Sequence, residues 1–286
     1  MFQMVFFGVA LPLAFGGMGV AAALWLHARE RSSLAAGVLS LGVGLGAALA
    51  QPGISGSFTF PPVSAPSWFF FFAILAALAA MAQTWVDRSE VGLILAGGVG
   101  AWLAASLLAP RVEYAWGTAE AFLWSAGVAL AVTLVFGAIE RVRKTAPPSA
   151  LAAALAGWSG ALAGTLIFSG TALVGQLSGA LACALTLPFF ASFAKSARSW
   201  VGGLVLPTAT LFVTLVSAGY FFAEMPLLAA LVALAGPIVA ALAAPLLFER
   251  LAKVPAWIVF QLVAIAPALI ALAIAFVNYE APSDYY

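Results

Sequence analysis

The chain consists of long apolar runs separated by short polar interruptions, and the length of the runs predicts its secondary structure. A helix that crosses a bilayer needs about 20 mostly apolar residues at a rise of roughly 1.5 Å per residue. The run from Pro148 to Phe193 carries no charged side chain and is roughly twice that length. We therefore expect two helices there, with a turn at Ser169-Gly170-Thr171. The same rule predicts ten membrane-spanning helices in all, at residues 4–26, 33–50, 67–86, 91–109, 119–140, 148–168, 171–193, 201–223, 226–248 and 254–278.

Composition supports the same fold class. Of the 286 residues, 65% are hydrophobic and 7% are charged, whereas an average soluble domain carries about 25% charged residues. So few polar side chains do not cover a water-soluble surface, and the apolar surface must face the lipid bilayer. We predict an all-α, polytopic integral membrane protein that forms a single transmembrane domain over residues 1–286. The net charge of +1 carries no information about partners, but the sequence has no basic stripe, so we expect no nucleic acid as a partner.

The basic residues predict how the helices are oriented. Cationic loops of membrane proteins face the cytoplasm. With ten helices, every Lys and Arg except Arg111 falls on alternate loops: Arg29, Arg31, Arg88, Arg141, Arg143, Lys144, Lys195, Arg198, Arg250 and Lys253. We therefore place the protein in the cytoplasmic (inner) membrane of the cell, with both termini on the outer side.

The basic loop at residues 140–149 divides the chain into two halves of five predicted helices, residues 1–140 and 148–286. An odd number of helices reverses the orientation of the second half, so related halves would form an inverted repeat, as in many secondary transporters. Only Ser-Trp at 67–68 and at 199–200 matches between the halves. The layout looks like that of drug/metabolite-type transporters. Those place both termini in the cytoplasm, however, and the sequence has no diagnostic motif, so we do not assign the family.

Several kinds of chemistry are excluded by residues that the chain lacks. With one histidine, His27, and one cysteine, Cys183, the chain cannot form an intrachain disulfide, a bis-histidine haem site or a site with several histidine or cysteine ligands. No charged residue is expected near the middle of the membrane, which argues against a proton relay and a voltage sensor. Glu120 and Glu224 come nearest, at outer helix ends. We expect neither a metal nor a cofactor.

One motif suggests an enzyme. The sequence GWSG at 157–160 resembles the nucleophile motif of rhomboid intramembrane proteases, with Ser159 in the nucleophile position. Those enzymes also need a histidine on a later helix, and none follows His27. We therefore expect no enzymatic activity and interpret the small residues here as helix-packing positions. The packing glycines that we predict are Gly157, Gly160, Gly164, Gly175 and Gly179.

Small and hydroxyl-bearing residues gather on the seventh and eighth predicted helices, at spacings that place them on one face of each. Prolines are also concentrated in the second half, and each frees a backbone carbonyl that helix breaks in transporters use for binding. These features predict an uncharged polar pocket among helices six, seven, eight and ten. Its candidate lining residues are Gln176, Ser178, Thr186, Thr208, Thr210, Thr214, Ser217 and Gln261. The alternative is that these side chains pack helices together and bond to backbone carbonyls.

Two functions fit these patterns. The first is a transporter or facilitator for a small neutral or weakly charged solute that works without an intramembrane carboxylate relay. The second is a structural or anchoring subunit of a larger membrane complex, since few charges, abundant glycine and alanine, and short loops suffice for that role. The partners that we expect are the lipid bilayer and a small-molecule substrate, or else a homo-oligomer or larger membrane complex.

Overall fold

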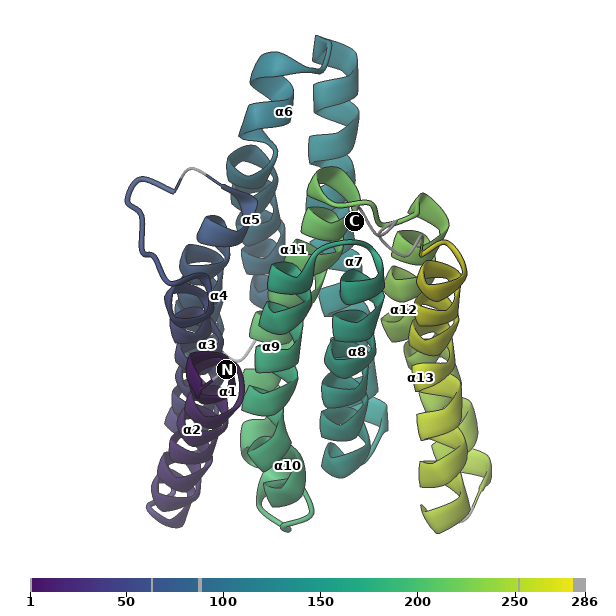
Figure 1. The fold of residues 1–286 in the computed structure, drawn as a ribbon. Coiled ribbons are helices and arrows are strands. Elements are labelled where there is room, and N and C mark those ends of the chain that lie inside the picture. Colours follow the sequence, from purple (N-terminus) through teal and green to yellow (C-terminus); the bar gives the residue numbers. More distant parts are fainter. Residues whose placement is uncertain (1, 63, 87–88, 252, 280–286) are drawn as a thin grey trace.

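The computed structural model describes residues 2–62, 64–86, 89–251 and 253–279. Within those residues every regular element is helical (Figure 1). In chain order the elements are α1 (Phe2–Val5), η1 (Phe6–Ala10), α2 (Leu11–Ala28), α3 (Ser32–Ser55), α4 (Ala65–Val86), α5 (Ser89–Leu107), α6 (Ala109–Tyr114), α7 (Thr118–Thr145), α8 (Pro148–Phe168), α9 (Ala172–Ala191), α10 (Ala197–Trp200), η2 (Val201–Leu204), α11 (Val205–Phe222), α12 (Leu227–Arg250) and α13 (Lys253–Val277).

The described residues contain ten helical spans that are long and apolar enough to cross a membrane, which confirms the predicted fold class. The first span joins α1, η1 and α2, and the eighth joins α10, η2 and α11. The turn expected between the sixth and seventh spans is present. There α8 ends at Phe168, Gly170 adopts a φ of 80°, and α9 begins at Ala172. Glycine suits this position because a positive φ carries no steric cost without a Cβ.

The predicted helix boundaries differ from the structure at the C-terminal ends of α3 and α7. Helix α3 passes through Pro52 and ends at Ser55, where Gly56 caps it with a φ of 70°. Helix α7 continues past the predicted end at Glu140 to Thr145. Charged and proline residues mark the ends of the apolar runs, but a helix need not end there when its last turns reach the interface. Residues 140–145 are therefore helix and not loop.

The eighth span departs from a regular α-helix at Gly202 and Gly203, and not at Pro207. Between α10 and α11 the 3-10 segment η2 contains Gly202 and Gly203. A Cβ on Gly203 would lie 2.0 Å from the carbonyl oxygen of Ala36 on α3, so this close packing requires glycine. The other interior prolines, which we expected to break helices, lie in continuous ones: Pro188 in α9, Pro237 and Pro245 in α12, and Pro267 in α13. A proline costs the helix one backbone bond and need not end it in a membrane, where neighbouring groups satisfy the freed carbonyl.

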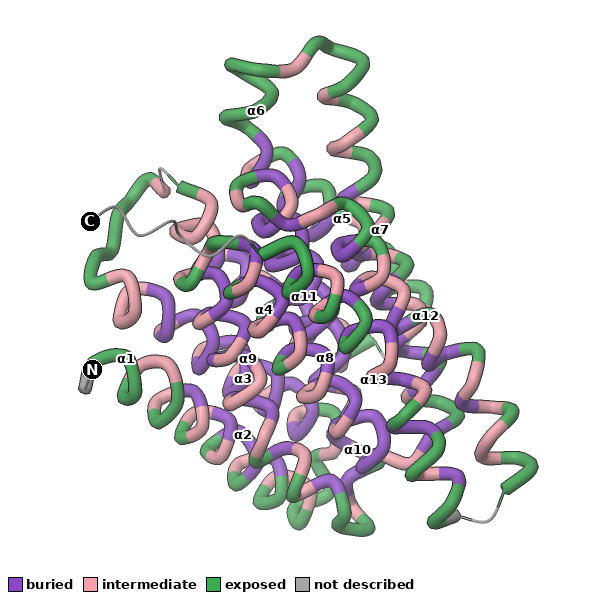
Figure 2. The backbone as a smooth tube through the Cα atoms, turned by 45° about the vertical axis from the view of Figure 1, so that its right-hand side comes forward, coloured by how far each residue is buried: buried purple, intermediate pink, exposed green. Residues whose placement is uncertain are grey.

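Helix α11 is the centre of the bundle. In the most apolar 18-residue stretch of the eighth span 94% of the residues are buried within the protein, against 22% in that of the first span. Helix α11 packs against α4, α7 and α12, with further contacts to α5, α8 and α9. Figure 2 shows the buried backbone in the middle of the bundle and the exposed backbone on the peripheral helices. The surface of the bundle is therefore made by the other nine spans among the described residues, and most of α11 meets only protein.

Some helix contacts within the first half of the chain have counterparts within the second half. Helix α2 packs against α3 as α8 packs against α9, and α5 packs against α7 as α12 packs against α13, at corresponding positions of the halves. Helix α8 also packs extensively against α13, whereas the described residues of α2 and α7 make no comparable contact. The inverted repeat over residues 1–140 and 148–286 stays a prediction.

The described basic residues other than Arg111 lie at one end of the bundle, which we call the basic end. It is formed by the connections that follow α2, α7, α9 and α12 (Figure 1). Arg88 lies outside the described residues, and Arg111 lies on α6 at the opposite end. The positive-inside rule predicts that the basic end faces the cytoplasm.

Candidate functional site

The polar residues predicted on the seventh span take part in helix packing. The Ser178 hydroxyl is buried and donates a hydrogen bond to the Ser159 carbonyl on α8, at 2.8 Å. The Thr186 hydroxyl donates to the carbonyl of Ala182, one turn earlier in its own helix. Gln176 lies near the N-terminal segment, with its amide nitrogen 3.9 Å from the sulfur of Met4. The hydroxyls of Ser178 and Thr186 thus bond to backbone carbonyls, as the packing alternative describes.

The candidates on α11 and α13 are buried. Thr214 donates to the carbonyl of Thr210 at 2.8 Å. The hydroxyls of Thr208 and Thr210 have no hydrogen-bond partner among the described residues. Gln261 donates to the Ala150 carbonyl on α8 at 2.9 Å, while its own carbonyl oxygen has no partner among the described residues. Ser217 lines an apolar groove, described below.

The predicted packing glycines divide into close and open positions. A Cβ on Gly157 or Gly164 would lie 2.9 Å from a side chain of α13, Ile265 or Leu272, and one on Gly175 would lie 2.9 Å from the Ala163 carbonyl oxygen. These three glycines therefore sit at close helix contacts. Gly179 has only one atom at 4.0 Å, and Gly160 is exposed with open space where a Cβ would stand. Gly160 thus contributes no close approach of helices, because its side of α8 faces away from the bundle.

The serine of GWSG is a packing residue as well. Ser159 is fully buried, its hydroxyl donates to the Leu155 carbonyl at 2.9 Å, and its own carbonyl accepts the bond from Ser178. The Ser159 hydroxyl is therefore engaged within α8, and its carbonyl is engaged in the α8–α9 contact.

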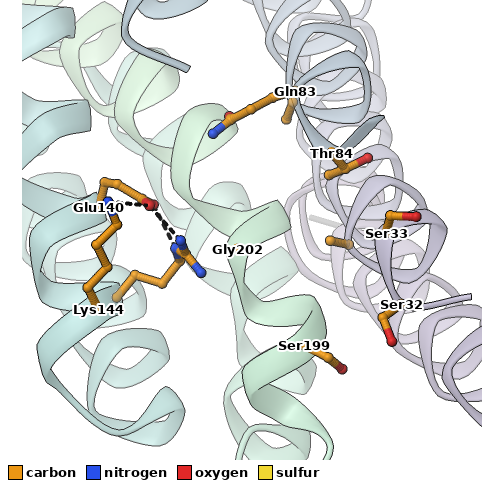
Figure 3. Close-up of a pocket in the computed structure, with 11 residues that line it drawn as sticks. Ser32, Ser33, Gln83, Thr84, Glu140, Lys144, Ser199 and Gly202 are labelled. Atoms are coloured by element: carbon orange, nitrogen blue, oxygen red, sulfur yellow. Dashed lines mark hydrogen bonds and ion pairs between the residues drawn. The ribbon is translucent and has the colours of Figure 1, made fainter. Parts of the chain in front are cut away.

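A polar cavity of about 380 Å³ lies at the basic end. Four parts of the chain line it, and the residues that they contribute are Ser32, Ser33 and Ala36 from α3; Ala80, Gln83 and Thr84 from α4; Glu140, Arg143 and Lys144 from α7; and Ser199 and Gly202 from α10 and η2 (Figure 3). Lys144 and Ser33 are exposed at its mouth, whereas Ala36 and Ala80 are buried at its base. Ala80 stands six residues before the end of α4, so the cavity reaches about 9 Å into the helical bundle.

Gln83 extends into this cavity from between two other helices. A Cβ on Gly92 of α5 would lie 2.5 Å from the Gln83 amide nitrogen and 2.7 Å from the Phe136 ring of α7. The Gln83 amide therefore lies close to Gly92, in the region where α5 and α7 meet. The next residue, Thr84, donates its hydroxyl to the Met81 carbonyl at 2.7 Å, which leaves the oxygen lone pairs as acceptors. Together they place an amide and a hydroxyl on the α4 wall of the cavity.

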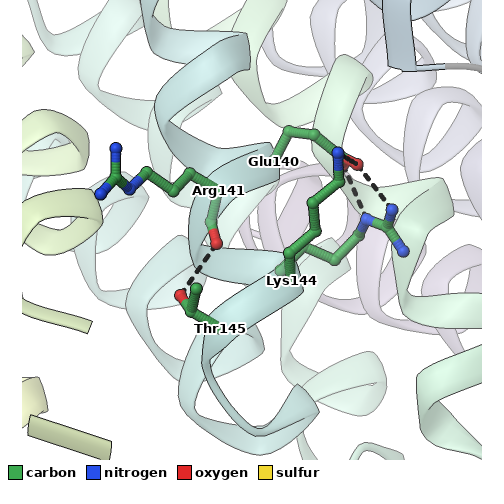
Figure 4. A network of polar contacts seen from close by, with 5 residues as sticks. Glu140, Arg141, Lys144 and Thr145 are labelled. Carbon is green, nitrogen blue, oxygen red and sulfur yellow. Dashed lines mark hydrogen bonds and ion pairs between the residues drawn. The ribbon is translucent and has the colours of Figure 1, made fainter. Parts of the chain in front are cut away.

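The α7 wall carries an ion pair made within one helix. Arg143 binds the Glu140 carboxylate with two nitrogens, Nε at 2.7 Å and Nη2 at 2.5 Å, and Lys144 Nζ lies 3.7 Å away (Figure 4). Spacings of three and four residues bring all three side chains to one face of the helix. The Glu140 side chain is 9% exposed and that of Lys144 is 52% exposed. The carboxylate is therefore neutralised where it is buried, and the second cation stands in the solvent-accessible part of the cavity.

Backbone that is not α-helical forms part of the cavity wall. Gly202 of η2 lines it, and a Cβ there would lie 3.5 Å from Arg143 Cδ. Ser199, in the preceding turn, has its hydroxyl 3.1 Å from His27 Nδ1 and donates that hydroxyl to the Ser196 carbonyl. The imidazole is then the donor to Ser199, which connects the end of α2 to the cavity wall. Irregular backbone within a membrane bundle is tolerated where it is buried in protein or lines a polar cavity.

Sequence reasoning missed this site because it ended the fifth helix at Glu140 and assigned Arg143 and Lys144 to a cytoplasmic loop. The signal was present in ERVRK, where an acidic residue precedes two basic ones at the helical spacings i+3 and i+4. Gln83 and Thr84 likewise fell at a predicted helix end. That these ends meet around one cavity depends on how the helices pack, which their separate sequence patterns do not show.

The fold and the cavity together define a multi-pass α-helical membrane protein with a polar cavity at one end. A scan against protein-family models finds no match, and searches of the curated proteins and of the solved structures find no similar chain.

Proposed function

We propose that the protein is a transporter or facilitator of a small neutral or weakly charged solute, and that the polar cavity at the basic end is where the solute binds. The cavity itself carries this proposal. Its volume of about 380 Å³ falls within the range of about 300–1,000 Å³ that small-molecule sites occupy. Its polar groups come from helices distant in sequence, so they converge on one space only in the folded bundle.

The charge of the lining favours one kind of solute. Glu140 is paired with Arg143, and Lys144 is the second cation beside them, so the lining charges sum to one positive. Gln83, Thr84 and the serines of α3 add neutral donors and acceptors. This set suits a solute with hydroxyl or amide groups and at most one negative charge. A multiply charged cation would meet Arg143 and Lys144 at close range.

The irregular eighth span supports transport over a purely structural role. Transporters bind solutes beside discontinuous helices whose non-helical backbone faces the site. Here η2 interrupts the eighth span where Gly202 lines the cavity, and the same span continues as the buried centre of the bundle. A movement of α10 and η2 against α3 would therefore change the cavity and the core together.

The test begins with solute binding. Purified protein is screened by thermal unfolding against neutral sugars, amino acids and small monocarboxylates, because a solute that binds the folded state raises its Tm with concentration. We expect at least one solute to do so. Thr84→Val and Lys144→Gln should weaken its binding at least fivefold. The stabilising solute is then offered to proteoliposomes, and we expect saturable uptake.

The matched control is Thr133→Val on α7. Its hydroxyl also bonds within its own helix, to the Ala129 carbonyl at 3.0 Å, and it does not line the cavity. Binding should be unchanged in this variant. Equal binding by wild type, Thr84→Val and Lys144→Gln would refute the cavity as the site. If no solute raises the Tm, or if none of the solutes that do so is taken up by proteoliposomes, transport is refuted and the structural subunit is favoured.

A further inference from the structure

A second pocket lies towards the end of the bundle opposite the basic end. It is an apolar groove of about 240 Å³ between α7 and α12, with α11 as its floor. Val128, Val216 and Ala230 are buried along it, and the leucines Leu130, Leu134 and Leu231 are exposed at its sides. All three helices belong to segments long enough to span a membrane. The medium that meets these exposed leucines is therefore hydrocarbon.

Small residues on α7 create the groove. Gly127 lines it, and a Cβ at this position would meet no atom within 4 Å. Ala131 lies one turn later on the same face. The α7 lining runs from Trp124 to Leu134, a rise of about 15 Å. That is half of the roughly 30 Å hydrocarbon thickness of a bilayer, so the groove has the depth of one leaflet.

A cation stands at the outer end of the groove. The Arg111 guanidinium donates a hydrogen bond of 2.5 Å to the carbonyl oxygen of Phe221, which lines the groove, and lies 5.7 Å from the centre of the Phe222 ring. That bond satisfies one terminal carbonyl of α11 and uses one of five N–H donors. Trp116, Trp124 and Tyr220 surround the Phe221 ring. Such amphipathic aromatic side chains are characteristic of the level of lipid headgroups.

We infer that this groove is a binding site for one phospholipid of the leaflet on the Arg111 side. One acyl chain fills the groove, and the headgroup phosphate binds the Arg111 guanidinium. The apolar lining, the depth of one leaflet and the cation at the headgroup level each match a different part of such a lipid. The guanidinium is a planar donor well suited to phosphate oxygens. Anionic and zwitterionic phospholipids share this phosphate, but the ammonium of a zwitterionic headgroup would be repelled by Arg111, so a lipid with a net negative headgroup is preferred.

The experiment is native mass spectrometry of the full-length protein, delipidated in detergent and titrated with phosphatidylglycerol or phosphatidylcholine. Wild type should bind one phosphatidylglycerol several-fold more tightly than phosphatidylcholine. Gly127→Leu fills the groove and should weaken both lipids at least fivefold. Its matched control is Gly98→Leu on α5, another exposed glycine with open space around its Cβ position, which should bind as wild type does.

Two further variants test the cation separately from the groove. Arg111→Gln should bind the two lipids equally, and Arg111→Lys should restore the preference for phosphatidylglycerol. Thermal unfolding of each variant shows whether it is folded. Undiminished lipid binding by Gly127→Leu would overturn the inference, as would an equal loss in Gly98→Leu. A wild-type dimer that Gly127→Leu converts to a monomer would also overturn it, because a second copy of the chain would then be the occupant.

Discussion

Replacing Gly203 by alanine tests how tightly the cavity wall is packed. A Cβ on Gly203 would lie 2.0 Å from the Ala36 carbonyl oxygen, 2.8 Å from its carbonyl carbon and 3.2 Å from its Cα. Ordinary van der Waals contact begins at 3.4 Å. The obstructing atoms are backbone, so no side-chain rotation relieves the overlap, and η2 must move away from α3 by about 1.4 Å, the difference between 3.4 and 2.0 Å. Overpacking of this kind costs typically 1–3 kcal/mol, and a rigid obstacle places Gly203→Ala near 3 kcal/mol.

The neighbouring residue supplies the control. A Cβ on Gly202 would lie 3.5 Å from Arg143 Cδ, an ordinary contact with a flexible side chain. Gly202→Ala should therefore unfold at the wild-type denaturant concentration or slightly above it, since alanine orders the chain at less entropic cost than glycine.

The assay is equilibrium unfolding of the purified protein in mixed micelles, followed by tryptophan fluorescence. Gly203→Ala should lose about 2–4 kcal/mol of unfolding free energy relative to Gly202→Ala. The same displacement should open the cavity, so a cysteine at Ser33 in a Cys183→Ala background should react faster with a water-soluble thiol reagent. Equal stability of the two alanine variants would refute the close packing of η2 on α3.

Two further predictions concern the core and the topology. Gln261→Met should change the unfolding free energy by less than about 1 kcal/mol, because the lost bond to α8 is offset by removal of a buried carbonyl oxygen without a partner among the described residues. Equilibrium unfolding measures this change. A loss of unfolding free energy above about 2 kcal/mol would contradict the prediction. In a Cys183→Ala background, an impermeant thiol reagent outside the cell should label a cysteine at Ser57 but not one at Lys144. The reverse pattern would refute the predicted orientation.

The fold class could be predicted from the sequence because the length of an apolar run is a local property. The turn at Gly170 and the ten spans followed from counting residues between polar interruptions. Helix ends were less predictable, since α3 and α7 both extend past the polar residues that seemed to end them. Which span lies at the centre was not predictable from hydrophobicity, because in lipid a buried helix and an exposed one are equally apolar.

The candidate site shows the same limit. Hydroxyl residues on α9 and α11 were visible as faces of single helices, but their function depends on the opposite helix. Ser178 meets a backbone carbonyl of α8, and Thr214 bonds within its own helix. The polar cavity instead joins the ends of α3, α4 and α7 with η2. Their juxtaposition depends on glycine contacts such as Gly203 with Ala36, which no periodicity in the sequence reveals.

The arrangement of charge in the cavity bears on how a solute would drive a conformational change. A ligand shifts an equilibrium only through interactions that differ between the two states. The Glu140–Arg143 pair lies within α7, so both side chains move with that helix. It keeps the buried carboxylate neutralised. A solute held between Lys144 on α7 and Thr84 on α4 would instead depend on the separation of the two helices. On the proposed mechanism, a solute that bridges Lys144 and Thr84 would therefore couple its binding to the separation of α7 and α4, while the ion pair neutralises the Glu140 carboxylate in the α7 wall.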